Sequence, residues 1–359
     1  MSDVQINFAI LGCGGIANHH IHHLTQISGV KAVGFQDISP AQLEKMRLRF
    51  PDAVFNTDPA AMLAAARPNL VCICTPNSTH HELSLQALAA GAHVMCEKPM
   101  AMTVKQAQEM ESARTTANLL GAINFSYRCV PGFRFAREII ASGELGRIQR
   151  VNVVYLQSFL GAPDTKHSWR NDLSIAGFGT LGDLGVHMID AVAFTTGLAA
   201  TRTVGISQVL VPTKLDSAGT PKPVTTDTNA SFLIEYDNGA IGTFETSQVA
   251  PGYGNHFRIE VSGTLGTVRY FSESAESLQL LAGSTLSKYS TWKSDDLPRI
   301  AVPSAFTGQQ PKSNLDSFVA AIRQHTHTDY PTFADGLAAQ RVLEAIGQSM
   351  LTKAWVQTI

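Results

Sequence analysis

The 359-residue sequence has almost no net charge. Its 27 Lys and Arg side chains are matched by 29 Asp and Glu side chains, which gives a formal charge of −2 at pH 7. A protein that binds nucleic acid or an anionic membrane surface usually has a basic excess that attracts its partner. We therefore expect neither a nucleic acid nor a membrane among the partners.

The sequence also lacks a long apolar run. No stretch reaches the roughly 18 uninterrupted apolar residues that a membrane-spanning helix needs. The first ten residues, MSDVQINFAI, have neither the basic segment nor the cleavage site of a secretory signal, since Asp3 and Gln5 interrupt them. These absences predict a cytoplasmic protein.

Cysteine is scarce, with five residues in the chain. Four of them (Cys13, Cys72, Cys74 and Cys96) lie in or beside apolar, strand-like runs. We expect small buried side chains there rather than a disulfide framework. Cys72 and Cys74 alternate along one predicted strand, where a metal or redox pair is the less favoured alternative.

Apolar residues, by contrast, make up 44% of the chain, which is ample for packed cores. At roughly 150 residues per domain, the length predicts two domains. Residues 1–125 alternate between strand and helix, as in a doubly wound parallel (Rossmann) sheet with crossover helices. The expected strands are uniformly apolar, as in a sheet covered on both faces: Asn7–Leu11, Val30–Gln36, Leu70–Cys74, His93–Cys96 and Leu120–Asn124. The expected helices are Ile16–Ile27, Pro40–Phe50, Ser78–Ala90 and Thr103–Ala117.

Residues 126–359 have a different pattern and form the predicted second domain. A helix over Pro131–Ser142 precedes longer strands, and Asp-Asn-Gly at 237–239 is typical of a hairpin turn because Asn and Gly tolerate positive φ. Helical periodicity returns over Asn314–His325 and Phe333–Thr352. This order predicts an α+β domain with a large, mainly antiparallel open sheet. Its expected strands are Val151–Gln157, Asn229–Tyr236, Ala240–Ser247, Phe257–Ser262 and Thr267–Phe271.

The segment GCGGIA follows the first predicted strand and opens the first helix. It fits the G-x-G-x-x-A pattern of dinucleotide-binding folds. In that pattern Gly12 permits a tight turn, Gly14 lets the backbone approach a pyrophosphate, and Ala17 lets the helix pack close to the sheet. The start of the helix, with Gly15 and Ile16, would offer N–H groups to the phosphates. Three glycines alone are weak evidence for a dinucleotide site, but a strand, a turn and a helix follow here in the required order.

An acidic residue follows where such folds place one. Asp37 lies 25 positions after Gly12, at the end of the second predicted strand, where its carboxylate would accept hydrogen bonds from the adenosine ribose. Alternatively, Asp37 caps the helix that begins at Pro40, and the two roles are compatible. Because no Arg or Lys stands beside Asp37 to bind a 2′-phosphate, the sequence favours NAD over NADP.

Polar residues also follow the apolar strand that ends in VCIC. Open α/β sheets bind ligands at the carboxyl ends of their strands. We therefore expect Thr75, Pro76, Asn77 and His80 to line the dinucleotide. The Ser-Thr pair at 78–79 could equally be an ordinary cap of the next helix.

Two further segments supply candidate catalytic groups. Lys98 follows the strand His93–Cys96 and directly precedes Pro99, which restricts the backbone at Lys98. The alternative to a catalytic role is a solvated Glu-Lys turn. We predict that the Lys98–Pro99 peptide bond is cis. Asp183 and His187 are four residues apart, so a helix would place them on one face. They could form a metal pair, a structural contact or an acid–base pair, but no third zinc ligand is evident nearby.

A run of four histidines lies within the first predicted helix, in the segment HHIHH. We expect these side chains to be solvated or to pack against neighbouring elements rather than to bind a metal. They are His19, His20, His22 and His23.

These segments together resemble the Gfo/Idh/MocA family, named after glucose–fructose oxidoreductase, inositol dehydrogenase and a rhizopine-catabolism protein. The resemblance covers essentially the whole chain. An EKP motif followed at this distance by a D-x-x-x-H pair is its most specific feature. The matching stretches are GCGGIA, TPNSTHHELSLQALAAGAHVMCEKPM, FSYRCVPGFRFAREIIASGELGRI, GFGTLGDLGVHMID and DTNASFLIEYDNGAIGTFE.

The resemblance implies that Lys98, Asp183 and His187 are the catalytic trio. It also implies a homodimer or homotetramer formed through the sheet of the second domain. Phe178 departs from the family, whose members often have a third glycine there, and could reshape the pocket. Further residues expected near the cofactor are Glu97, Lys98, Trp169 and Arg170, and those near the substrate are Lys98, Asn124, Tyr127, Arg128, Gln157 and Arg170.

The implied reaction is reversible hydride transfer between a secondary alcohol carbon and nicotinamide C4. His187 would be the general base, since imidazole titrates near neutral pH, and Asp183 would orient it or bind a substrate hydroxyl. Lys98 would hydrogen-bond the reacting oxygen. The polar side chains suit a polyhydroxylated ring, an inositol first and a pyranose sugar second. An NAD-dependent glycosidase is an alternative, as is a non-catalytic NAD-responsive regulator, against which the intact trio counts.

Overall fold

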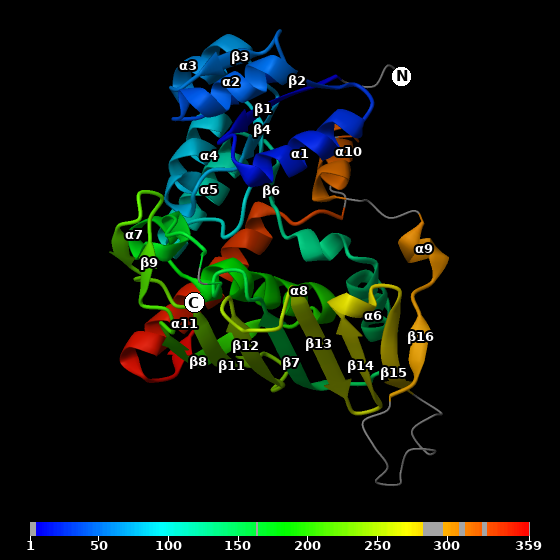
Figure 1. The fold of residues 1–359 in the computed structure, drawn as a ribbon. Helices are drawn as coiled ribbons and strands as arrows, with labels where there is room; N and C mark the ends of the chain where they lie inside the picture. The colour runs from blue at the N-terminus through cyan, green and yellow to red at the C-terminus, as the bar shows by residue number, and fades with distance from the viewer. Residues whose placement is uncertain (1–4, 163, 283–296, 309–312, 325–328, 359) are drawn as a thin grey trace. The chain divides into compact units, whose positions relative to one another are not determined.

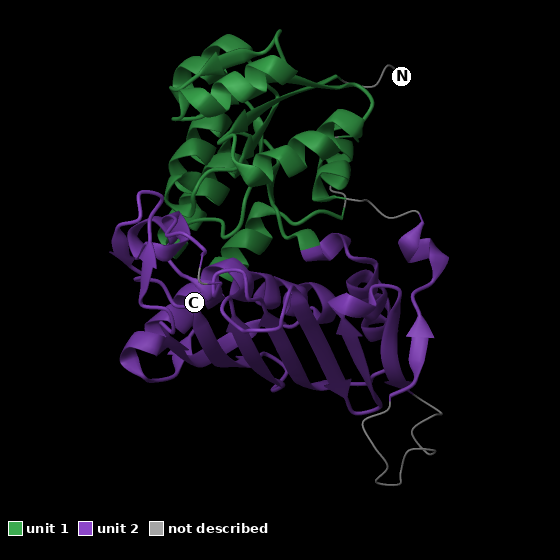
Figure 2. Ribbon diagram, viewed as in Figure 1, with its two compact units in different colours: residues 1–126, 311–340 green, residues 127–310, 341–359 purple. Residues whose placement is uncertain are grey.

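A computed structural model describes residues 5–162, 164–282, 297–308, 313–324 and 329–358 (Figure 1). The chain divides into two compact units (Figure 2). The first unit comprises residues 1–126 and 311–340, and the second comprises residues 127–310 and 341–359. The first crossing lies beside the boundary predicted after residue 125, but the return of 311–340 to the first unit was not foreseen. Helical periodicity reveals an apolar face without showing which sheet that face covers.

The first unit contains the predicted parallel sheet. Its six strands have the order β3-β2-β1-β4-β5-β6, and every neighbouring pair is parallel. The sequence prediction did not include β3, which has only three residues and no fully buried side chain. The strands are β1 (Ile6–Leu11), β2 (Val30–Gln36), β3 (Val54–Asn56), β4 (Leu70–Ile73), β5 (His93–Cys96) and β6 (Gly121–Ile123).

Helices cover the sheet of the first unit. The helix α10, which returns from the far end of the sequence, places Leu315 and Phe318 in the same core as Ile21 and Leu24 of α1. Burying this apolar surface explains why the late segment joins the first unit. The helices are α1 (Gly15–Gln26), α2 (Pro40–Arg49), α3 (Pro59–Ala66), α4 (His80–Ala89), α5 (Val104–Thr116) and α10 (Asn314–Gln324). Within the predicted helix Asn314–His325, His325 lies outside the described residues.

The second unit contains a nine-stranded sheet in the order β16-β15-β14-β13-β7-β12-β11-β8-β17. All neighbouring pairs are antiparallel except β7 and β12, so the predicted mainly antiparallel sheet is confirmed. A separate hairpin pairs β9 (Thr213–Leu215) with β10 (Pro221–Pro223). The sheet strands are β7 (Ile148–Leu156), β8 (Ala200–Gln208), β11 (Asn229–Tyr236), β12 (Ile241–Ser247), β13 (His256–Gly263), β14 (Gly266–Phe271), β15 (Ser277–Ala282), β16 (Arg299–Ala301) and β17 (Val356–Gln357).

The two faces of this sheet differ. The helices α6 (Pro131–Ala141) and α8 (Val186–Thr196) pack on one face, where alternate strand residues are buried. The opposite face leaves large apolar side chains exposed, including Ile206 at 62% and Leu233 at 38%. The sheet therefore has one covered face and one open face, on which apolar side chains such as Ile206 lie among charged ones such as the Arg150–Glu260 pair.

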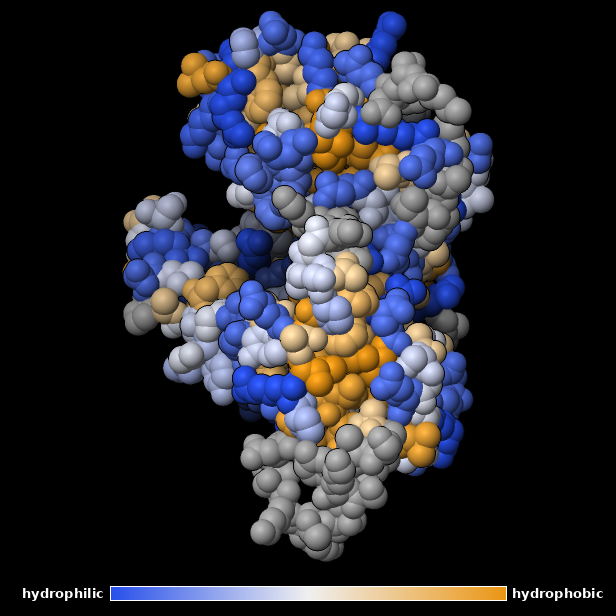
Figure 3. Space-filling model, turned by 90° about the vertical axis from the view of Figure 1, so that its right-hand side faces the viewer, coloured by the Kyte–Doolittle hydropathy of each residue, from blue (hydrophilic) through white to orange (hydrophobic). Residues whose placement is uncertain are grey.

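The end of the sheet at β16 carries a further apolar contact. Phe135 of α6 packs against Phe306 of α9 (Ser304–Thr307), with ring centroids 5.3 Å apart. Figure 3 shows apolar side chains gathered between hydrophilic ones on the side of the second unit that carries α9 and β16. The segment that follows β16 is therefore held against α6 by aromatic packing.

Cys13, Cys72, Cys74 and Cys96 are buried, as predicted, and Cys129 is half-buried. Burial raises the pKa of Cys72 and Cys96 well above the ordinary range, so both thiols stay neutral.

None of the described helices combines the length and apolarity that crossing a bilayer requires.

Candidate active site

The glycine loop lies between the ends of β2 and β4. Gly12 has φ +86°, and its N–H donates to the carbonyl of Gln36 at 2.8 Å. A Cβ at Gly12 would lie 2.7 Å from Thr75 Cγ2 and 2.9 Å from the carbonyl carbon of Cys74. Only glycine fits both this backbone conformation and this space.

The start of α1 fits a phosphate group. Gly14 is the N-cap and supplies no side-chain hydrogen bond, and the first turn contains no acidic residue. A Cβ at Gly14 or Gly15 would meet no atom within 4 Å, so there is room in front of these N–H groups. Ile16 continues the turn, and Ala17 is fully buried against the sheet, as predicted. A helix start of this kind binds anionic phosphates through its N–H groups and its dipole.

Asp37 is held through both carboxylate oxygens. Oδ2 accepts a hydrogen bond from the Cys13 N–H at 2.7 Å, and Oδ1 accepts one from the Ser39 N–H at 2.8 Å. The N-cap of α2 is Ser39, so the alternative that Asp37 caps this helix is wrong. A carboxylate oxygen has a second lone pair, which leaves Asp37 able to accept hydrogen bonds from ribose hydroxyls. Burial and the charge of Asp37 raise the pKa of the Cys13 thiol to about 12.

The segment after β4 is fixed by short polar contacts. Asn77 and its two successors form a 3-10 turn (η1, Asn77–Thr79), and the Thr79 hydroxyl donates to Thr75 Oγ1 at 2.7 Å. His80 is fully buried, with its two ring nitrogens 3.0 Å from the Thr75 carbonyl and 2.9 Å from the Pro99 carbonyl. Burial lowers the pKa of His80, and the two carbonyls oppose that effect. His80 therefore joins two loops, whereas the sequence predicted that it lines the dinucleotide; Thr75 and Pro76 remain partly exposed.

The EKP segment leaves β5 with its glutamate turned inward. The Lys98–Pro99 bond is cis, which confirms the prediction. Glu97 is buried, and its Oε1 accepts hydrogen bonds from His20 Nε2 at 2.7 Å and Asn124 Nδ2 at 2.8 Å. Glu97 and Asn124, predicted to contact cofactor and substrate, thus bind each other behind Lys98, whose side chain is partly exposed.

In the second unit, Asp183 lies on a π-helical turn (η4, Leu181–Gly185) that continues into α8. Such turns are rare and often occur at functional sites. Asp227 fixes the start of the turn, because its carboxylate accepts the N–H groups of Gly179 at 2.7 Å and Leu181 at 2.8 Å. A Cβ at Gly179 would lie 1.8 Å from the Asp227 carbonyl oxygen, so this glycine cannot be replaced without a shift.

The Asp183 carboxylate has two polar neighbours. Gln248 Nε2 donates to its Oδ2 at 2.6 Å, and the Arg170 guanidinium lies 3.7 Å from the same oxygen. Arg170 stacks over Trp169, with its Cζ 4.4 Å from the ring centroid. Arg170 and Asp183, both predicted site residues, therefore lie together. Gln248 was not predicted, because it follows β12 in no recognisable motif.

His187 follows on α8 and is only 7% exposed. The Tyr127 ring meets it edge-on, with centroids 5.2 Å apart. The Tyr127 hydroxyl donates to the Tyr155 hydroxyl at 2.7 Å, and Gln157 Nε2 donates to the same oxygen at 3.1 Å. Burial raises the pKa of both phenols, so they remain neutral donors.

Asn255 closes this polar network. Its Oδ1 accepts from the Tyr155 hydroxyl at 2.9 Å and from Gln157 at 2.5 Å. Tyr127 and Gln157 were predicted, whereas Tyr155 and Asn255 were not. One signal was present: Tyr155 in β7 and Gln157, one residue past its end, have the spacing that places side chains on one face of a strand.

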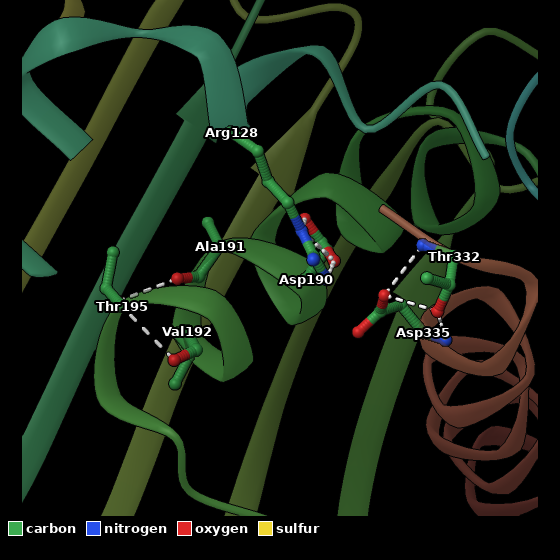
Figure 4. A network of polar contacts seen from close by, with 7 residues as sticks. All are labelled: Arg128, Asp190, Ala191, Val192, Thr195, Thr332 and Asp335. Carbon is green, nitrogen blue, oxygen red and sulfur yellow. Dashed lines mark hydrogen bonds and ion pairs between the residues drawn. The ribbon is translucent and has the colours of Figure 1, made fainter. Parts of the chain in front are cut away.

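Arg128, predicted to lie near the substrate, is paired with Asp190. Its Nε lies 3.1 and 3.0 Å from the two carboxylate oxygens of Asp190, and its Nη2 lies 2.5 Å from Oδ1 (Figure 4). Asp190 sits on α8, three residues after His187. The pair therefore holds the helix that carries His187, which is a supporting role. Figure 4 also shows, in the first unit, the carboxylate of Asp335 accepting the Thr332 N–H and hydroxyl at 2.7 Å each.

Phe178 acts in packing within the second unit. A Cβ at Gly347 of α11 (Phe333–Thr352) would lie 2.6 Å from Phe178 Cε1, and a Cβ at Gly182 would lie 2.9 Å from Phe178 Cβ. The ring thus occupies space that these two glycines leave. The departure from the family pattern is accommodated by packing on α11.

The predicted trio is divided between the units. Lys98 belongs to the first unit, and Asp183 and His187 belong to the second. Within the described residues, no group of three or more His, Cys, Asp or Glu side chains could hold a metal ion. The first unit thus offers a dinucleotide cradle, and the second carries Asp183 and His187 on a continuous helical segment.

Family models match both parts of the chain. The model described as "Oxidoreductase family, NAD-binding Rossmann fold" matches residues 6–124, and the "GFO/IDH/MocA C-terminal domain" matches residues 133–269. D-glucoside 3-dehydrogenase of Escherichia coli K12 is 33% identical over 69% of this chain and 71% of its own. Inositol 2-dehydrogenase of Rhizobium meliloti is 25% identical over 98% of both chains. A solved structure of levoglucosan dehydrogenase with NADH and L-sorbose has a TM-score of 0.87 at 25% identity and covers 99% of both chains.

Proposed function

The chain belongs to the GFO/IDH/MocA family of NAD-binding oxidoreductases, and on that premise we propose that it oxidises a secondary ring hydroxyl of a cyclic polyol or sugar. The relatives named for a glucoside, an inositol and levoglucosan support this substrate class. The observation that carries the proposal is the helical segment with Asp183 and His187. Its aspartate is oriented by Gln248 and Arg170, and its histidine lies against a neutral tyrosine.

The roles follow from the chemistry of each side chain. A bound NAD would supply the hydride acceptor. His187 takes the hydroxyl proton, and Asp183 keeps the imidazole and the substrate hydroxyls oriented. Lys98 donates a hydrogen bond to the reacting oxygen and stabilises its alkoxide character. Arg170, Gln157 and the unpredicted Asn255 offer polar groups to the other ring hydroxyls.

Among cyclic substrates, the sequence alone put an inositol before a pyranose sugar. The 33% identical relative is named for a D-glucoside, which favours a sugar derivative. An absorbance screen at the NADH band, with inositols and pyranosides against NAD and NADP, tests the proposal. We expect NADH to form with at least one of these rings. No NADH with any of them, or aglycone release without net NADH, would favour the regulator or the glycosidase instead.

Cofactor choice follows from Asp37, and we propose that NAD is preferred. Its carboxylate would repel a 2′-phosphate, so wild-type kcat/KM should be about 10²-fold higher with NAD than with NADP. Asp37→Ala should reduce this preference by at least about tenfold. The control Asp52→Ala, at an exposed position of the first unit, should leave the ratio unchanged. Equal kcat/KM values for the two cofactors in the wild type would contradict the assignment.

Oligomerisation follows from the open face of the second sheet, and we propose a homodimer or homotetramer formed through it. Ile206 and Leu233 are exposed there on neighbouring strands, and burying such a face against its copy is the usual solution. Light scattering should report a dimer or tetramer at micromolar concentration, and Ile206→Glu with Leu233→Glu should shift it towards monomer. Leu48→Glu, which introduces the same residue at an exposed position of α2, is the control. A wild-type monomer would contradict this proposal.

A further inference from the structure

We propose that His20 is a positioning residue for Lys98, acting through the buried carboxylate of Glu97. The proposal depends on the proposed function at one point, the role of Lys98 in the reaction. It assigns a task to one member of the HHIHH run, for which the sequence predicted no more than solvation or packing. All four contacts that carry it lie within the first unit.

His20 differs from its neighbours in the run. It is 1% exposed, whereas His19 and His22 lie at the surface of α1. Its Nε2 is 2.7 Å from Glu97 Oε1. Because an ionised carboxylate can only accept, this ring nitrogen carries the proton and donates it. The other ring nitrogen has no hydrogen-bond partner among the described residues, so the contact with Glu97 is what orients the ring.

Glu97 is kept ionised although it is buried. Burial alone would raise its pKa, but the hydrogen bond from His20, the charge of Lys98 and the amide of Asn124 outweigh that effect and bring the pKa to about 2. A buried charge is stable only while its partners are in place. Without the His20 donor, the carboxylate would lose its strongest hydrogen bond and would shift or take up a proton.

The second oxygen of Glu97 reaches Lys98. Oε2 accepts the Lys98 backbone N–H at 3.3 Å, immediately before the proline bond. The carboxylate is held from further sides by Asn124 after β6 and, through it, by Asn314 of α10 at 3.4 Å. Glu97 therefore fixes the main chain from which the Lys98 side chain leaves. His20 completes its set of donors.

The position of His20 gives this contact a second consequence. It lies on α1, the helix that begins at Gly15 of the glycine loop. The helix start that would bind the dinucleotide phosphates and the donor that fixes the Lys98 loop thus belong to one element, about one and a half helical turns apart.

Three variants separate positioning from simple packing. His20→Leu removes the donor but retains bulk. His20→Gln keeps an amide that can donate from about the position of the ring Nε2. His22→Leu makes the same change at an exposed histidine of the same helix. Each is measured for hydrogen exchange of the peptide containing the Lys98 amide, for NADH affinity by fluorescence, and for kcat with NAD and myo-inositol or methyl α-D-glucopyranoside.

We expect His20→Leu to speed exchange of the Lys98 amide at least about tenfold and to lower kcat by about 10- to 100-fold, as losses of supporting groups do. The NADH dissociation constant should change less than threefold, roughly, because the helix start is untouched. His20→Gln should restore most of both quantities, and His22→Leu should behave as wild type.

Wild-type exchange and kcat in a folded His20→Leu protein would overturn the proposal, as would a His20→Gln variant no better than His20→Leu. If His20→Leu does not fold, His20→Asn replaces it, because the asparagine amide is too short to reach Glu97. We expect His20→Asn to show the same faster exchange and lower kcat, and wild-type values of both would overturn the proposal. Lys98→Ala tests the role of Lys98 separately from the role of His20. If exchange is faster in His20→Leu but Lys98→Ala is fully active, then His20 does position the Lys98 main chain and Lys98 has no role in the reaction.

Discussion

Replacing His187 with alanine is expected to lower kcat by about 10²–10⁴-fold, the usual contribution of a positioned acid–base group. Affinity for NADH should stay unchanged, because the proposed role concerns the hydroxyl proton and not the dinucleotide. KM should also change little, since the lost interaction strengthens only in the transition state. Stopped-flow measurement of NADH formation at varied substrate concentration gives kcat and KM, and a fluorescence titration gives the affinity for NADH.

A merely structural His187 would give another pattern. Its ring packs against Tyr127 and is nearly buried, so its loss in that case would lower the melting temperature and leave the turnover of folded protein intact. His81→Ala is a suitable control, because His81 contacts Glu109 at 2.8 Å in the first unit, outside the proposed machinery. A folded His187→Ala enzyme with wild-type kcat would refute the assignment.

Replacing Lys98 should have the second largest effect. Lys98→Ala and Lys98→Met should both lower kcat by about 10²–10³-fold, the range typical of removing one donor from a developing oxyanion. Methionine restores the length of the side chain without its charge or its N–H groups. Similar losses in the two variants would therefore assign the effect to charge and hydrogen bonding.

The control for this pair is Lys105→Met, which removes an ammonium that is 86% exposed on α5. It should leave kcat and KM unchanged. A Lys98→Met enzyme that retains wild-type kcat would show that the side chain acts only by filling space, which contradicts the proposed role.

The glycine loop was predictable because local geometry determines it. A tight turn after a strand requires Gly12, and the following helix start and Asp37 come at fixed distances along the chain. The parallel sheet was predictable for a similar reason, since its strands are continuous apolar runs. The short β3 and α3 were missed, because three to eight residues carry too little periodicity.

The direction in which a polar side chain points was less predictable. Glu97 and His80 follow strands at the ligand edge, as Lys98 does, yet both turn inward and bind interior groups. Sequence position places a residue at this edge but does not decide whether its side chain faces a ligand or the core. Arg128 illustrates the same limit, because its partner Asp190 lies 62 residues further along the chain.

The polar neighbours of Asp183 and of the Tyr127–Tyr155 pair beside His187 were beyond sequence reasoning for a different reason. Gln248 and Asn255 approach from strand ends far along the chain, where neither forms a motif. Their role depends on the register of β12 and β13 beside β7, which is a property of the assembled sheet.

The most direct measurement follows the hydride itself. The experiment uses the substrate that the wild type oxidises, myo-inositol or methyl α-D-glucopyranoside, labelled with deuterium on its ring carbons. The mass of the resulting NADH is then measured by mass spectrometry. The account predicts NADH heavier by one deuterium, with one ring ketone formed for each. Unlabelled NADH, or product formed without net NADH, would contradict direct hydride transfer from a secondary alcohol carbon.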